Sequence, residues 1–88
     1  MHAVVVKVTI NDPDGATAAL RDEVVPRVSG APGFVAGYWV RVSGNQGIST
    51  IVFESEDAAR TAAQHIKSPA GEPATVESVE VGEVVANA

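Results

Sequence analysis

The fold is decided by residues 3–15, which read AVVVKVTINDPDG. From Ala3 to Ile10 the run is rich in valine and every second residue is apolar, which is typical of a strand packed on one side of a sheet. Asp12 followed by Pro13 predicts a helix N-cap with proline in the first helical position, where its missing N–H costs no hydrogen bond. This stretch therefore predicts a strand followed directly by a helix.

The helix that begins at Pro13 is expected to be interrupted. Apolar residues recur at helical spacing as far as Val28, so one face of the helix is apolar. Pro26 removes a backbone donor, and the helix is therefore expected to kink or end near Val25. The residues 30–33, GAPG, predict a clear stop.

Beyond this stop the sequence predicts two strands, a helix and a last strand. The expected elements are a strand over Phe34–Val42, a hairpin over Ser43–Gly47, a strand over Ile48–Glu54, a helix capped by Ser55, a loop over Lys67–Ala74, and a strand over Thr75–Val85 with a candidate bulge at Gly82. The order is β-α-β-β-α-β, and right-handed crossovers place both helices on one side of a four-stranded antiparallel sheet. The sequence thus predicts an α+β, ferredoxin-like fold in a single domain spanning residues 1–88.

Composition narrows the classes of function. The 88 residues include 6 Lys+Arg against 11 Asp+Glu, a formal net charge of -5, and no cysteine. Repulsion from phosphate argues against nucleic acid as a partner, and the lack of cysteine excludes disulfide scaffolds and thiol catalysis. No run approaches the ~20 apolar residues that a membrane-spanning helix needs, and no targeting segment is visible. We expect a cytoplasmic protein that acts neither on a membrane nor on nucleic acid.

The second face of the sheet is expected to be apolar as well. Tyr38 and Trp39 are neighbours in one strand, so their side chains point to opposite faces, and one large aromatic side chain must lie away from the helices. Thr50 and Val52 likewise alternate with Ile51 and Phe53. A homodimer in which two such faces meet would bury this surface. The alternative is a monomer whose open face is more polar than this pattern suggests.

Two segments carry a resemblance to a known family. Residues 32–39, PGFVAGYW, follow the first helix, and residues 52–58, VFESEDA, open the second. Together they resemble the antibiotic biosynthesis monooxygenase-like family of the dimeric α+β barrel superfamily. Residues 24–28, VVPRV, also resemble small actinobacterial members that have no assigned activity. The resemblance implies a homodimer whose two sheets form a barrel, with a pocket between sheet and helices in each subunit.

The chemistry of the family's enzymes does not carry over in full. The resemblance implies two kinds of activity: cofactor-free oxidation of aromatic substrates with Asn, Trp and Tyr side chains, and haem degradation with a histidine ligand, an Asn and a Trp. Val8 stands at the Asn position of the first strand, and Ala62 stands at the Trp position of the second helix. Val8 has no side-chain hydrogen-bonding group, and Ala62 has no aromatic ring to pack on a macrocycle, so neither can replace the family's residue. We expect no cofactor and no metal site.

Six residues remain as candidates for a site. Tyr38 could donate a proton and Trp39 could stack on an aromatic ring, although core and interface packing is the plainer interpretation of both. His65 is a candidate base or ligand, and more commonly such a histidine caps a helix end. Candidates for ligand binding are Thr50, Thr61 and Arg41.

The roles of these candidates are expected to differ in kind. Arg41 and Lys7 could hold an anion or, more commonly, pair with Glu54, Glu77 or Glu80 across strands. Few polar groups are expected on the helix-facing side, chiefly Tyr38 or Thr50 together with Thr61.

The sequence thus supports two hypotheses. One is a dimeric protein that binds a small apolar or aromatic molecule, with cofactor-free monooxygenase activity as its enzymatic form. The other is a non-catalytic homodimeric structural or interaction module.

Overall fold

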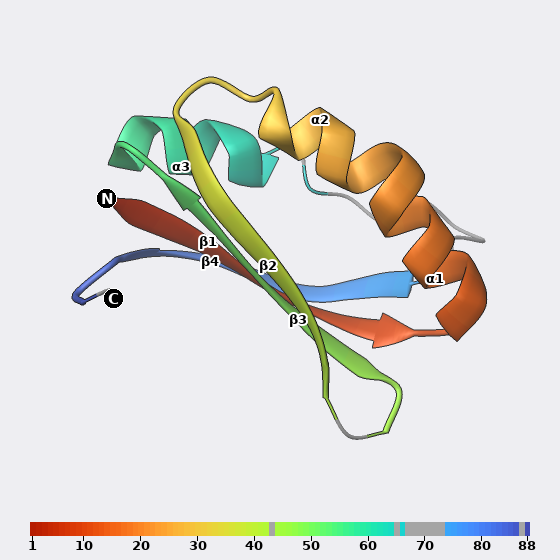
Figure 1. Cartoon of the computed structure of the whole chain (residues 1–88). Coiled ribbons are helices and arrows are strands. Elements are labelled where there is room, and N and C mark those ends of the chain that lie inside the picture. Colours follow the sequence, from red (N-terminus) through yellow and green to blue (C-terminus); the bar gives the residue numbers. More distant parts are fainter. Residues whose placement is uncertain (43, 65, 67–73, 87) are drawn as a thin grey trace.

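The computed structural model describes residues 1–42, 44–64, 66, 74–86 and 88 (Figure 1). The elements are β1 (His2–Ile10), α1 (Pro13–Ala19), η1 (Leu20–Val24), α2 (Val25–Ser29), β2 (Phe34–Val42), β3 (Gln46–Phe53), α3 (Glu56–Gln64) and β4 (Ala74–Glu83). This order confirms the β-α-β-β-α-β prediction, with boundaries that differ by one or two residues at several strand ends. The predicted loop over Lys67–Ala74 lies outside the described residues except for Ala74, which begins β4.

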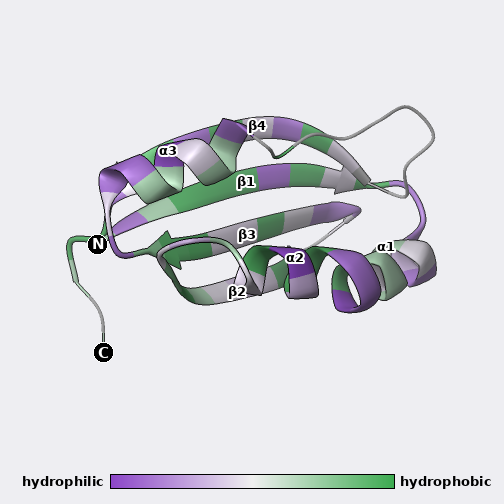
Figure 2. Cartoon of the chain, turned by 90° about the horizontal axis from the view of Figure 1, so that it is seen from above, coloured by the Kyte–Doolittle hydropathy of each residue, from purple (hydrophilic) through white to green (hydrophobic). Residues whose placement is uncertain are grey.

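The four strands form one antiparallel sheet in the order β2-β3-β1-β4. Both helical stretches lie on the same side of the sheet (Figure 1). Seen from above, α3 lies over β1 and β4, whereas α1, η1 and α2 lie along β2 (Figure 2). This is the ferredoxin-like α+β arrangement that the sequence predicts. We call the covered side the helix face and the other side the open face.

The core lies on the helix face. Val4 and Val6 of β1 pack with Ile51 and Phe53 of β3 beneath Ala59 of α3, and all five are buried. The alternation predicted for the first strand is confirmed, because Val5 between the two buried valines is exposed. Phe34 adds an edge-to-face contact with Phe53 at a ring-centroid distance of 6.2 Å.

The first helical stretch keeps its helical path through Pro26. The Asp12 side chain accepts a hydrogen bond from the Gly15 N–H at 3.3 Å, which confirms the predicted cap. The α-helical pattern breaks where the proline predicts a break, but the chain does not end its helix there. Instead, η1 is a π-helical turn, and α2 begins at Val25 so that Pro26 stands in its first turn, where a missing N–H is tolerated.

The last strand contains a bulge at a place other than the predicted one. Gly82 pairs in regular register with Ala3, so the prediction of a bulge at Gly82 is wrong. The register shifts instead between Lys7 and Val8, where Glu77 is the extra residue, and the Thr9 hydroxyl donates a 2.6 Å hydrogen bond to the Glu77 carboxylate. The bulge restores the alternation and places three valines of β4 on the core: Val76, Val79 and Val81.

The loop before β2 packs closely against the start of α3. Gly33 adopts a φ of +79°, and a Cβ added there would lie 2.9 Å from the Cβ of Ala58. Only glycine combines this backbone conformation with so close an approach. Its carbonyl accepts a 2.8 Å hydrogen bond from the Glu54 N–H, which fixes the loop to the end of β3.

No helix among the described residues is long and apolar enough to cross a bilayer.

Candidate functional site

Pairing between β2 and β3 decides which aromatic residue faces the helices. Trp39 pairs with Ser49 and is half-buried, whereas Tyr38 pairs with Thr50 and is 63% exposed. Cross-strand partners share a face, and Ser49 lies in the same alternation as the buried Ile51. Trp39 therefore faces the helices, and Tyr38 lies on the open face.

The indole of Trp39 lies over a glycine. A Cβ added at Gly37 would come within 2.8 Å of Trp39 Cη2 and 3.5 Å of Phe34 Cε2. A side chain at position 37 would therefore displace the indole from the sheet. The absence of that side chain lets the six-membered ring of Trp39 rest against the backbone of its own strand, where it forms a flat, apolar part of the helix face.

Ser49 is a polar residue that is buried on this face, and among the described residues it is the buried polar one. It is 9% exposed, lies beside Trp39 and opposite Val6, and forms no hydrogen bond through its hydroxyl among the described residues. Because this oxygen has no partner and is not among the fully buried unpartnered atoms, it keeps some exposure and can meet a donor or acceptor of a ligand. Ser49 is not among the site residues that the sequence predicts. The signal was available: a small polar residue at the alternation position between Gly47 and Ile51.

Arg41 follows Trp39 on the same face. It pairs with Gly47, is exposed, and has no ion pair among the residues that the structure describes. Cross-strand pairing of Arg41 and Lys7 with glutamates was expected, and this expectation is wrong for the described residues. Lys7 pairs with Ile48 and Ser78, neither of which is acidic. We define the β2–β3 strip as five residues of the helix face: Gly37, Trp39, Arg41, Gly47 and Ser49.

The threonine candidates lie elsewhere. Thr50 lies on the open face between Tyr38 and Val5, so neither Tyr38 nor Thr50 supplies the helix-facing polar group that the sequence suggested. Thr61 is exposed on α3. It lines a surface pocket of about 290 Å³ together with Ala31, Pro32, Asp57, Ala58 and Ala62. His65 lies outside the described residues.

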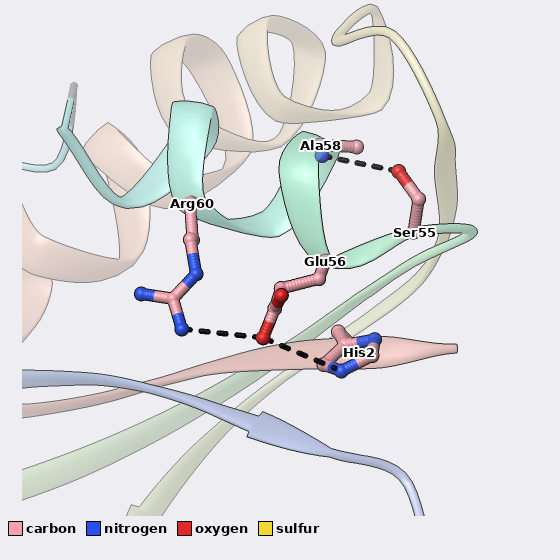
Figure 3. Close-up of polar contacts among 5 residues, drawn as sticks. All are labelled: His2, Ser55, Glu56, Ala58 and Arg60. Carbon is pink, nitrogen blue, oxygen red and sulfur yellow. Dashed lines mark hydrogen bonds and ion pairs between the residues drawn. The ribbon is translucent and has the colours of Figure 1, made fainter.

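A polar cluster lies at the other end of the sheet (Figure 3). The Glu56 carboxylate is 3.2 Å from the Arg60 guanidinium and 3.9 Å from His2 Nε2. His2 Nδ1 is buried and has no hydrogen-bond partner among the described residues. His2 pairs with Phe53, four residues along β3 from Ser49, which corresponds to about 13 Å. This cluster is therefore separate from the β2–β3 strip.

One solved structure is similar to this chain over nearly its whole length. It is MhuD, a haem degrader from Mycobacterium tuberculosis, determined with two haems bound in its active site. The two sequences are 27% identical, the TM-score is 0.56, and the match covers 97% of this chain and 98% of that chain. No protein-family model matches the chain, and no curated protein matches it.

The residues of the β2–β3 strip do not fit haem as a bound cofactor, and the candidate ligand His65 lies outside the described residues. None of the five strip residues, all of which the structure describes, offers a side chain that commonly ligates haem iron. His2 lies about 13 Å from Ser49 along the sheet, beside Glu56. Val8, at the position where the resemblance implies an Asn, presents a methyl group toward Gly47. No group of three or more His, Asp or Glu side chains suited to a metal occurs among the described residues. The expectation of no cofactor stays a prediction.

The fold and the likeness to MhuD agree with the resemblance found in residues 32–39 and 52–58. The similar structure has the same class of fold over almost the same length, so the resemblance does not depend on the turn and cap motifs alone. The chain is a ferredoxin-like α+β protein similar to the antibiotic biosynthesis monooxygenase-like family.

Proposed function

We propose that this chain is a homodimeric protein that binds a small apolar or aromatic molecule on its helix face. One observation carries the proposal: the half-buried indole of Trp39 lies beside the buried residue Ser49, whose hydroxyl has no partner among the described residues, on a floor that is mostly apolar. An apolar surface with one or two placed polar groups is the usual composition of a small-molecule site. The likeness to a protein with haems in its active site supports the same reading.

The homodimer is proposed from the open face. Four large apolar side chains are exposed there at neighbouring positions of β1, β2 and β3: Val5 at 39%, Tyr38 at 63%, Val40 at 53% and Ile48 at 37%. We call these four residues the open-face patch. A second copy that places the same patch against it would bury all four side chains. The single domain over residues 1–88 and the cytoplasmic location belong to the same proposal.

Cofactor-free monooxygenase activity is the second candidate. The likeness to a haem-degrading enzyme is the observation that favours catalysis. Tyr38 cannot serve as a proton donor in the same intrasubunit site as Trp39, because the two side chains lie on opposite faces. Ser49 is then the hydroxyl nearest to Trp39 in the strand pairing. Binding is therefore the function that the arrangement supports best, and the non-catalytic module is its alternative.

The test uses the intrinsic fluorescence of Trp39, the one tryptophan of the chain. A panel of quinols and polyketide-like aromatic compounds is titrated into the protein, and the expected result is quenching or a shifted emission with at least one compound. Ser49→Ala is expected to weaken that binding by about 3- to 10-fold, since it removes one hydrogen bond of about 1 kcal/mol. Oxygen consumption with the bound compound distinguishes an oxygenase from a binding protein.

Ser78→Ala is the matched control, because Ser78 lies on β4 opposite Lys7 and outside the β2–β3 strip. It is expected to leave the affinity unchanged. An unchanged Trp39 emission across the whole panel would contradict ligand binding and favour the non-catalytic module. Equal effects of the two serine substitutions would contradict the role of Ser49.

A further inference from the structure

Arg41 lies at one end of the β2–β3 strip with its guanidinium unpaired. Residues two apart in a strand share a face, and the Cα atoms of Arg41 and Trp39 are about 7 Å apart. The cross-strand partner of Arg41 is Gly47, and β2 is an edge strand, so no neighbouring strand brings a carboxylate to it. Among the described residues its side chain forms neither an ion pair nor a hydrogen bond. The cation is therefore free to meet a ligand.

The floor beside Arg41 is apolar. Gly47 is buried, and a Cβ added there would lie 3.0 Å from Val8 Cγ2 and 3.5 Å from Ile10 Cδ1. Methyl groups of β1 therefore cover the backbone of Gly47. They offer no hydrogen-bond acceptor that would compete for the guanidinium. Along β2 the strip thus runs from an aromatic ring to a cation, and the strand positions paired with these two residues carry no acidic side chain.

The Trp39 ring followed by the Arg41 cation favours a ligand that carries a negative charge. The chain has a net charge of -5, so its field repels anions in general, and an anionic ligand needs a local cation to be held. Arginine binds two oxygens of a carboxylate or a sulfonate through two parallel N–H donors, and such charge-assisted bonds are stronger than neutral ones. A ligand whose ring lies on Trp39 can place an acidic group on Arg41 across the distance of two residues.

We propose that the ligand of this site is an aromatic anion, with its ring on Trp39 and its carboxylate or sulfonate on Arg41. This inference rests on the proposed function, which requires only an apolar or aromatic ligand. It adds the charge of the ligand and assigns Arg41 as the residue that determines this specificity. Ser49 then lies beside the ring, where its hydroxyl meets a polar substituent.

The test uses two fluorescent probes that share one ring system. Anilinonaphthalene sulfonate carries a sulfonate, and N-phenylnaphthylamine is the same skeleton without it. The wild-type protein is expected to bind the sulfonate at least 10-fold more tightly than the uncharged probe. Arg41→Gln is expected to remove most of that difference while the affinity for the uncharged probe changes less than twofold, and Arg41→Lys is expected to retain part of it. Arg27→Gln, which removes an exposed cation from α2, is the control for net charge and is expected to change neither affinity.

The outcomes separate this inference from the proposed function. Equal binding of the two probes by the wild-type protein, or equal effects of Arg41→Gln and Arg27→Gln, would overturn the role of Arg41 while leaving the aromatic site in place. Failure of both probes to bind would overturn the site itself. Trp39→Leu is expected to weaken both probes at least fivefold, and unchanged binding in this variant would place the probes elsewhere and also overturn the inference.

Discussion

The two faces of the sheet carry nearly the same kinds of residue but differ in what covers them. On the helix face Val4 and Phe53 are 0% and 1% exposed, whereas the open-face patch is more than one-third exposed at every position. Both faces are rich in β-branched and aromatic side chains, as a strand requires. Apolar content alone therefore does not identify a core. Burial on the helix face comes from α3 and α2, and on the open face we propose that a second molecule supplies it.

Phe53 and its neighbour Val52 give the largest expected difference between the faces. Phe53→Ala removes a ring that is in contact with Phe34 and buried under α3, so it is expected to destabilise the protein by about 3–5 kcal/mol. Val52→Ala, one residue earlier and on the open face, is expected to cost about 1 kcal/mol. Equilibrium urea unfolding at one protein concentration measures both. If Phe53→Ala does not fold, Phe53→Leu replaces it. Phe53→Leu is still expected to lower the free energy of unfolding more than Val52→Ala does, by a smaller margin. Equal losses at the two positions would contradict the contrast between the faces.

Tyr38→Asp tests whether a second copy covers the open face. A carboxylate placed within the open-face patch would have to be buried without a partner, so the dimer dissociation constant is expected to rise by more than about 100-fold. Sedimentation velocity measures this as a change from twice 9.0 kDa to 9.0 kDa. Thr61→Asp introduces the same charge on the exposed side of α3 and is expected to leave the dimer intact. A wild-type protein that sediments as a monomer would contradict the homodimer altogether.

Much of the fold could be predicted because its signals are local. The alternation in residues 3–10, the Asp12 cap and the Ser55 cap each depend on residues within one or two turns of each other. The sequence predicts the bulge at Gly82, whereas it lies at Glu77, because a bulge belongs to a pair of strands and one strand does not show where its partner shifts. The π-helical turn over 20–24 likewise depends on how Pro26 is accommodated within a packed helix.

The candidate site was harder to predict than the fold. Alternation shows that Tyr38 and Trp39 face opposite ways but not which of them faces the helices. The answer comes from the register shift between Phe34 and Ala36, which places Phe34 and Trp39 on the same face although they are five residues apart. The sequence does not single out Ser49, because a serine in a strand is common and only its burial beside Trp39 makes it a candidate.

Ser55→Ala is expected to have the smallest effect on the free energy of unfolding. It removes the N-cap of α3, which covers the helix face and not the open face. The Ser55 hydroxyl accepts a 3.1 Å hydrogen bond from the Ala58 N–H at the start of α3, and loss of such a cap costs about 1 kcal/mol (Figure 3). Ser29→Ala is the matched control, because the Ser29 hydroxyl donates to the Pro26 carbonyl and satisfies no free N–H. It is expected to cost less than about 0.5 kcal/mol. Since α3 packs only on the helix face, Ser55→Ala is expected to lower the free energy of unfolding without changing the dimer dissociation constant. A parallel loss of dimer affinity would show that the two faces are energetically coupled.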